Sequence, residues 1–161
     1  FKKKVQKLYA FYDEGGKGDK KLVYRTEVIK KYPDYPMFEG ERLVGLGSKY
    51  LMIDQDYDLL TLNEPLVVVE YQADGSSMNM WRQYWLNPRG FAYYKKLVLS
   101  YNPPFVKRMK ASAQLVAFKM IAGENNFISD SPDKLATIIM LPVGLLLYCV
   151  IRYKVKRLYG L

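Results

Sequence analysis

The strongest constraint in this sequence is a run of seventeen residues without a charged side chain, from Leu135 to Ile151. As a helix it would extend about 26 Å at about 1.5 Å per residue. A bilayer core is about 30 Å thick and usually takes about 20 residues to cross. Pro142 and Gly144 interrupt the run, and Ser131-Pro132-Asp133 before it predicts a helix start with a capping side chain. The run therefore predicts a helix that is either buried or in contact with a membrane.

The residues that follow this run favour a helix in contact with a membrane. Four basic side chains follow it at once and are interspersed with three tyrosines: Arg152, Lys154, Lys156 and Arg157, with Tyr148, Tyr153 and Tyr159. An anionic membrane surface attracts such segments by about 1 kcal/mol per basic residue. We predict an interfacial or re-entrant helix on the cytoplasmic face of the cell membrane, peripheral or monotopic, within segment 132–158. A buried core helix with a basic tail and a full membrane span are the alternatives. The expected contact residues are Leu145, Leu146, Tyr148, Arg152 and Lys154.

Charge and residue usage limit the function. The chain has 161 residues, enough for one domain with its own core. Its 25 basic and 16 acidic residues give a net charge of +9, which favours anionic partners. The absence of histidine excludes a Ser-His-Asp triad and histidine metal sites, and a single cysteine, Cys149, excludes a disulfide framework. Because the sequence opens at Phe1 without a methionine, we expect it to belong to a longer protein.

Hydrophobic spacing and turn residues predict a mixed α/β chain. Three helices are expected in the first third, over 3–12, 23–32 and 41–53, separated by a loop at Gly15–Asp19 and a turn at Pro33–Pro36. A hairpin is expected from Leu59–Leu62 and Leu66–Tyr71, because Val67-Val68-Val69 is the best strand signal. Two further helices are expected over 88–101, capped by Asn87, and over 104–122, ended by Gly123.

Several short motifs follow one another in the same order as in a known enzyme family, which this sequence therefore resembles. In chain order they lie at residues 23–28, 32–36, 38–42, 62–65, 70–77 and 87–91, followed by Leu141-Pro142-Val143-Gly144. Over roughly 140 residues this order is similar to that of family 2 glycosyltransferases that decorate bacterial surface polysaccharides.

The resemblance implies the acceptor-side, C-terminal half of a GT-A domain. The expected fold is a partial GT-A fold, a short hairpin plus helices, over residues 1–86, followed by a helical, membrane-associated region over 87–161. The implied reaction transfers a sugar from a nucleotide-sugar donor, of UDP type, to a polysaccharide or lipid-linked acceptor. The Gly-rich βαβ opening, the donor pocket and the ligands for Mg²⁺ or Mn²⁺ are expected in an N-terminal half that this sequence does not show.

The resemblance also places a catalytic base. In an inverting transfer the acceptor hydroxyl loses its proton as it attacks, and a carboxylate within hydrogen-bond reach can accept that proton. Related enzymes carry an acidic pair at the start of a helix below the acceptor, and Glu41 matches the base, with Glu39 as helper. Arg42 stands where the second acid is common. The alternative is that both glutamates simply favour a helix N-terminus.

Acceptor contacts are expected at Trp81, Arg82 and Asp74, because related synthases keep an Arg-Trp pair near the acceptor channel. Here the order is reversed, and packing of Trp81 with Trp85 on one helical face is the alternative. Asp54-Gln55-Asp56 spells an Asp-X-Asp metal motif, but it follows a predicted helix and is better explained as a solvated turn. We therefore assign no metal ligand in this sequence.

Two other functions are compatible with the composition. A non-catalytic, membrane-associated basic module would act through anionic lipid. A nucleic-acid binder would use the lysines at residues 2–7 and at 107–110, but the basic residues are scattered and no nucleic-acid motif is present. Lys107, Arg108 and Lys110 are more simply a solvated helix face, so we expect no nucleic-acid partner.

Overall fold

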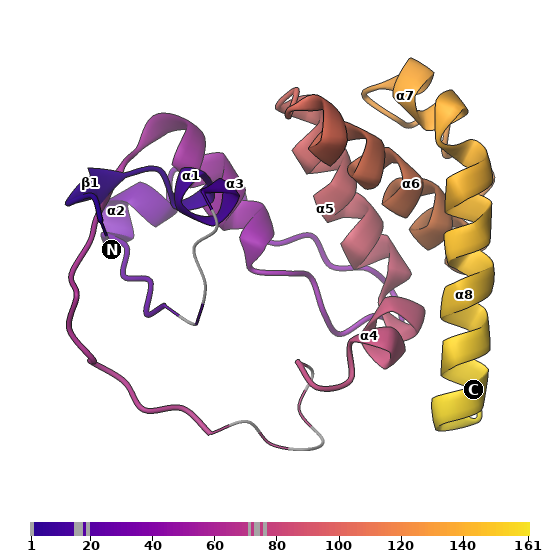
Figure 1. Ribbon diagram of the computed structural model, residues 1–161, viewed down its shortest axis with the longest axis horizontal. Helices are drawn as coiled ribbons and strands as arrows, with labels where there is room; N and C mark the ends of the chain where they lie inside the picture. The colour runs from indigo at the N-terminus through magenta and orange to yellow at the C-terminus, as the bar shows by residue number, and fades with distance from the viewer. Residues whose placement is uncertain (1, 15–17, 19, 71, 73–74, 76) are drawn as a thin grey trace. The chain divides into compact units, whose positions relative to one another are not determined.

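The structure, a computed structural model, describes residues 2–14, 18, 20–70, 72, 75 and 77–161. It is mixed α/β and mostly helical, with one small two-stranded sheet among the described residues (Figure 1). The chain forms two compact units. Unit 1 contains residues 1–35 and 46–70, and unit 2 contains residues 36–45 and 71–161.

Unit 1 is a small assembly of short elements: β1 (Val5–Gln6), α1 (Leu8–Asp13), α2 (Thr26–Ile29), α3 (Gly47–Asp56) and β2 (Leu59–Leu60). The strands β1 and β2 pair antiparallel, with Val5 opposite Leu60. Helix α1 packs on α3, and Leu8, Leu51 and Ile53 are buried there. The helices predicted over 3–12, 23–32 and 41–53 are therefore each only partly formed.

A carboxylate from α3 caps helix α1. Asp54 is buried, and its oxygens accept hydrogen bonds from the backbone N–H groups of Leu8 and Tyr9, the latter at 3.0 Å. The first N–H groups of a helix have no partner inside the helix, so this side chain satisfies two of them. The prediction that Asp54-Gln55-Asp56 is a solvated turn is wrong: these residues end α3, and Asp54 holds two helices of unit 1 together.

The predicted hairpin does not form. Leu59–Leu60 pairs with β1 instead, and residues 66–70 contain no strand. All three valines of the predicted strand are more than half exposed, with Val68 fully so. Strand propensity alone does not make a strand, because the backbone also needs a partner for its N–H and C=O groups.

Unit 2 is built around α6 (Phe105–Ile121), which lies between α5 (Pro88–Ser100) and α8 (Leu141–Tyr159) in Figure 1. Helix α4 (Met80–Leu86) precedes α5, and α7 (Lys134–Ile139) precedes α8. Nearly every residue from Ala111 to Lys119 is buried, because α6 has neighbours on two sides. The sequence-based predictions for α5 and α6 are confirmed to within one residue at each end.

The uncharged run is divided between two helices. The break falls at Met140, because Pro142 has no N–H to donate to the Ile138 carbonyl and its ring would clash with that carbonyl in a continuous helix. The cap of α7 is Asp133, whose Oδ1 accepts from Ala136 N at 2.9 Å, whereas Ser131 bonds to the Thr137 hydroxyl at 2.7 Å. Among the described residues, the helices are too short or too polar for any of them to cross a membrane.

Gly144 does not interrupt α8 but allows it to approach α6. A Cβ at this position would lie 2.6 Å from Val116 Cβ and 2.9 Å from the Ala113 carbonyl oxygen. Gly144 is buried, so the absent side chain is what lets the two helices touch.

We predict that Gly144→Ala lowers the free energy of unfolding by about 1–3 kcal/mol, because a methyl group there overpacks the α6–α8 interface. Urea denaturation followed by circular dichroism measures the change. Gly45→Ala is the matched control, since a Cβ at Gly45 would meet nothing within 4 Å. Equal effects of the two substitutions would contradict this explanation of Gly144.

Candidate functional site

Glu41 is fixed at the N-terminus of α5. Its Oε1 accepts a hydrogen bond from Arg89 N and its Oε2 accepts one from Gly90 N, both at 2.8 Å. These are the first N–H groups of α5, since Pro88 has none. The positive end of the helix dipole also favours a negative charge at this place. The carboxylate of Glu41 thus caps a helix that lies more than forty residues further along the chain.

Asn87 makes the reciprocal contact. Its Oδ1 accepts from Arg42 N at 2.8 Å and from Leu43 N at 3.0 Å, while its Nδ2 donates to Gln83 Oε1 at 3.0 Å. Asn87 is buried and stands at the predicted cap position, but its side chain bonds to segment 36–45 rather than to its own helix. Glu41 and Asn87 therefore each accept hydrogen bonds from the backbone N–H groups that follow the other residue in the chain.

Gly90 allows this close approach. A Cβ on Gly90 would collide with the Leu43 carbonyl oxygen and lie 3.3 Å from Val44 Cγ2. Further along α5, the rings of Phe38 and Tyr93 lie 6.4 Å apart between centroids. Segment 36–45 is thus held along the first turns of α5 at several points.

The other predicted acids and aromatic residues lie around this contact. Glu39 is exposed beside a turn at Gly40, which has a φ of +78°. Trp81 is half-buried on α4 and packs edge-on against Tyr84, with ring centroids 6.1 Å apart. Arg82 is exposed on the same helix. Asp74 lies outside the described residues.

An aromatic cluster links α4 to the helix that Glu41 caps. The Tyr84 ring lies 4.8 Å from the ring of Phe91 and 5.2 Å from that of Phe118. Phe91 follows Gly90 directly, so Trp81, Tyr84 and the Glu41 cap belong to one region of unit 2. Among the described residues, Glu41 forms no hydrogen bond or ion pair with Trp81 or Arg82. Trp81 packs on Tyr84, whereas the alternative predicted from the sequence was packing of Trp81 with Trp85.

The predicted membrane-contact residues occupy different positions on α8. Leu145, Leu146 and Arg152 are exposed, whereas Tyr148 and Lys154 are half-buried. The opposite face of α8, with Gly144, Ile151 and Val155, is buried. One side of α8 is therefore buried in unit 2, and the exposed side carries apolar and basic side chains.

The chain's charge is concentrated in the second half. Residues 88–161 hold twelve basic and three acidic side chains, so twelve minus three gives the whole net charge of +9. All three acids of this half are paired: Glu124 and Asp130 with Lys119, and Asp133 with Arg108. A surplus of cations therefore covers the helices of unit 2.

A buried lysine organises the loop after α6. Lys119 is 4% exposed, and its Nζ lies 2.9 Å from Glu124 Oε2 and 2.6 Å from Asp130 Oδ2. Burial by itself lowers the pKa of Lys119, but the hydrogen bonds with the two carboxylates outweigh it and raise that pKa. The hydrogen bond from Lys119 lowers the pKa of Glu124. Arg89 Nε joins this network to the Glu41 cap, at 3.2 Å from Glu124 Oε1.

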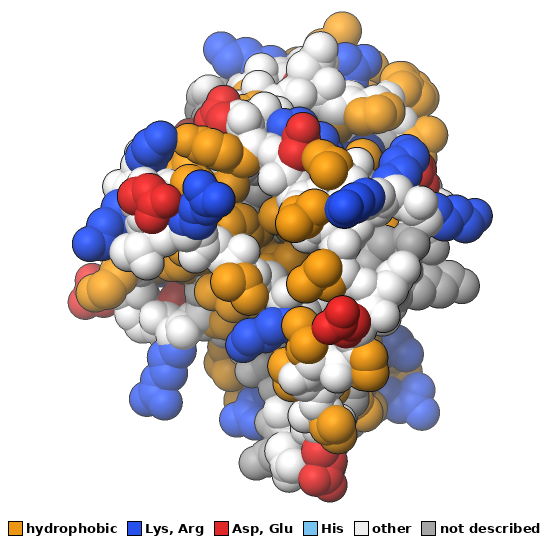
Figure 2. Space-filling view, turned by 90° about the vertical axis from the view of Figure 1, so that its left-hand side faces the viewer, with side chains coloured by type: hydrophobic (Ala, Val, Ile, Leu, Met, Phe, Trp, Pro, Cys, Tyr) orange, Lys and Arg blue, Asp and Glu red, His pale blue; other side chains and the backbone are white. Residues whose placement is uncertain are grey.

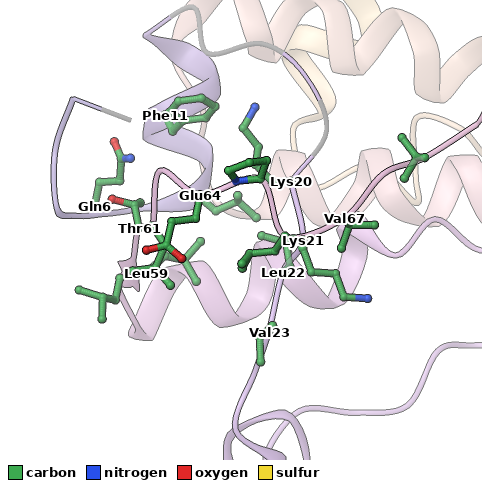
Figure 3. A pocket seen from close by; sticks show the side chains of 16 residues that line it. Gln6, Phe11, Lys20, Lys21, Leu22, Val23, Leu59, Thr61, Glu64 and Val67 are labelled. Atoms are coloured by element: carbon green, nitrogen blue, oxygen red, sulfur yellow. The ribbon is translucent and has the colours of Figure 1, made fainter.

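Unit 1 has an open, mostly apolar groove of about 530 Å³. It is lined by residues 20–23, by residues 59–67 except Asn63, and by Gln6, Leu8, Phe11 and Val69. Figure 3 shows Phe11 and Lys20 close together at this groove, where Lys20 Nζ lies 4.3 Å from the centre of the Phe11 ring. Figure 2 shows hydrophobic side chains at the surface among lysine and arginine side chains on one face of the molecule.

The described residues include no group of three or more acidic, histidine or cysteine side chains that could hold a metal ion. Comparison with protein-family models, curated proteins and solved structures finds no match for this chain. Any functional reading therefore depends on its own residues and geometry.

The Lys119 network makes stability depend on pH at both ends of the scale. The pKa values of Glu124 and Asp130 lie below their ordinary values of 4.5 and 3.8. The stability that these two carboxylates contribute is therefore present above those ordinary values and is lost as the pH falls below them. The raised pKa of Lys119 stabilises the fold below its ordinary value of 10.5 and is lost as pH rises past it.

We predict that Lys119→Met lowers the free energy of unfolding by roughly 1–3 kcal/mol at pH 7 and flattens its fall below pH 4.5. Urea unfolding between pH 3 and pH 8 measures both effects. Lys110→Met, on the exposed side of the same helix, is the control and should keep the wild-type slope. An unchanged acid slope in Lys119→Met would rule out this network as its source.

Proposed function

We propose that this chain is the acceptor-side half of an inverting, family 2-like glycosyltransferase of the GT-A type. It transfers a sugar from a nucleotide-sugar donor, of UDP type, to a bacterial cell-surface polysaccharide or a lipid-linked acceptor. Residues 1–86 belong to the catalytic domain, and residues 87–161 form its helical, membrane-associated region. The observation that supports this proposal best is the Glu41 carboxylate, held in one orientation at the N-terminus of α5.

Glu41 can act as the base while it caps α5. A carboxylate has about four acceptor positions, and the two backbone N–H bonds use one on each oxygen. The remaining position on each oxygen can accept a hydrogen bond from a hydroxyl group of the saccharide acceptor, at an oxygen–oxygen distance of about 2.6–3.2 Å. As that hydroxyl oxygen bonds to the anomeric carbon, its proton passes to Glu41 and the bond from the sugar to the nucleotide diphosphate breaks. Glu39, exposed next to the same turn, is the proposed helper.

Acceptor recognition is proposed for α4 and the segment before it. Trp81 offers an aromatic face to a sugar ring, and Arg82 offers exposed guanidinium N–H groups to hydroxyl or phosphate oxygens. Both residues belong to the aromatic region that adjoins the α5 N-terminus, and Asp74 is proposed as a third contact.

The apolar surface of unit 1 supports an incomplete catalytic domain. Leu62, Leu66 and all three valines of residues 67–69 are more than half exposed, and they border or line the groove. A run that is apolar in both side-chain directions is typical of a strand buried on both faces of an α/β sheet. We propose that the donor-binding half covers this run. That half would also supply the carboxylates for Mg²⁺ or Mn²⁺, whose part is to hold the donor diphosphate, since the described residues offer no such cluster.

Membrane attachment is proposed through the exposed face of α8. Leu145 and Leu146 precede Arg152 along the helix, so an apolar stretch is followed by a basic one. This order suits a helix that lies in the interface with its cations at anionic lipid headgroups. The proposed location is the cytoplasmic face of the cell membrane, where a lipid-linked acceptor is within reach.

A second function is a non-catalytic, membrane-associated basic module. The concentration of the net charge in residues 88–161 favours it, because anionic lipid would then be the partner without any transfer reaction. In that case Glu41 would serve only as the cap of α5.

We predict that Glu41→Gln leaves donor binding unchanged and lowers transfer at least about 100-fold, the range of a lost general base. The test uses the longest natural polypeptide that contains these residues, with UDP-sugars and Mn²⁺, and measures binding by calorimetry and transfer by product formation.

Asn87→Ala is the matched control, since it weakens the same junction but keeps the carboxylate. It should retain most of the transfer activity. Equal losses in both variants would assign Glu41 a capping role alone, and transfer that survives Glu41→Gln would exclude it as the base.

A further inference from the structure

One end of unit 2 exposes a group of large apolar side chains. It comprises the start of α6, the helix α7 and the start of α8, near one another at the α7 end of the helices in Figure 1. Each side chain of the group is at least 47% exposed. We call this group the apolar end: Phe105, Val106, Leu135, Ile138, Ile139 and Val143.

The contacts of Asp133 place α6 and α7 together at this end. Asp133 caps α7 through Oδ1, and its Oδ2 lies 3.4 Å from Arg108 Nε in the first turn of α6. The Arg108 guanidinium lies 5.9 Å from the centre of the Phe105 ring. Phe105 and the start of α7 are therefore neighbours, although about thirty residues separate them in the sequence.

Lysines gather beside the apolar end. Lys95 lies in the second half of α5, and Lys107 and Lys110 lie in the first two turns of the neighbouring helix α6. Burial and the positive charges of Lys110 and Lys107 lower the pKa of Lys95 to about 8. Within residues 88–121 the sequence has no acidic side chain at all. Positive charges that repel one another in this way are stabilised when an anion joins them.

We propose that the apolar end inserts into the interface of an anionic bilayer, with Lys107 and Lys110 at the lipid phosphates and the half-buried Lys95 beside them. This rests on the membrane attachment proposed above for the exposed face of α8, and it adds a second contact surface at the end of unit 2 where that helix begins. An apolar group with lysines beside it is complementary to acyl chains below a layer of phosphates.

The test is flotation of the full chain with vesicles of phosphatidylcholine alone or with phosphatidylglycerol. The paired variant Ile138→Ser/Ile139→Ser removes apolar contacts, and the triple variant Lys95→Gln/Lys107→Gln/Lys110→Gln removes the cations. Each should lower the partition coefficient on anionic vesicles at least about tenfold, and wild type should bind neutral vesicles weakly. Far-UV circular dichroism checks that the variants fold.

Two matched controls remove the same number of charges, or the same number of apolar side chains, from unit 1. Lys2→Gln/Lys4→Gln/Lys21→Gln removes three exposed charges, and Val67→Ser/Val68→Ser removes exposed apolar groups. Both should bind vesicles as wild type does. If the lysine control loses as much as the α5–α6 triple variant, attraction is by net charge alone and the proposed surface is wrong.

The remaining outcomes separate the two proposals. Vesicle binding that persists in both unit 2 variants would overturn the apolar end but leave membrane attachment intact. The absence of binding to any vesicle would overturn both. Saturable binding of inorganic phosphate that depends on the three lysines, without vesicle binding, would indicate a soluble phosphate ligand. A dimer in light scattering that Ile138→Ser/Ile139→Ser abolishes, again without vesicle binding, would assign the surface to a second copy of the chain.

Discussion

Unit 2 depends on an exchange of side chains between segment 36–45 and the start of α5. Glu41 satisfies the backbone N–H groups of Arg89 and Gly90, and Asn87 satisfies those of Arg42 and Leu43. Hydrogen bonds to a charged group contribute about 1.5–3 kcal/mol each, and an unpaired N–H at a buried helix end costs a similar amount. The exchange therefore joins two distant parts of the chain and sets the orientation of the carboxylate that is proposed as the catalytic base.

The same device recurs in unit 1 and explains which parts of the fold the sequence could predict. Helices α5 and α6 have local signals at their ends, Asn87-Pro88, Pro104 and Gly123, and were predicted to within one residue. Helix α1 is capped by Asp54 from α3, a contact that no local pattern reveals. The predicted hairpin failed for the same reason: β2 pairs with β1, more than fifty residues earlier, and Val67-Val68-Val69 has propensity without a pairing partner in the described structure.

The candidate site was predicted in part. The resemblance to glycosyltransferases implies an acidic pair at the start of a helix and so points to Glu41, but the helix predicted over 41–53 begins only at Gly47. Its real partners, Arg89 and Gly90, belong to a motif whose role the sequence did not disclose. The sequence predicts a solvated helix face at Lys107, Arg108 and Lys110, whereas the structure leaves Lys110 exposed and half-buries the other two. Their proximity to Lys95 comes from the packing of α5 on α6, which no local pattern reveals.

The measurement that tests this account most directly is the behaviour of two backbone amides in ¹H–¹⁵N spectra of wild type and Glu41→Gln. If the carboxylate caps α5, the amide protons of Arg89 and Gly90 resonate downfield in wild type and exchange slowly with solvent. In the variant both should move upfield and exchange faster, while the amide of Gly123 beyond α6 stays unchanged. Resonances of Arg89 and Gly90 that are identical in the two proteins would contradict the cap on which the proposed site depends.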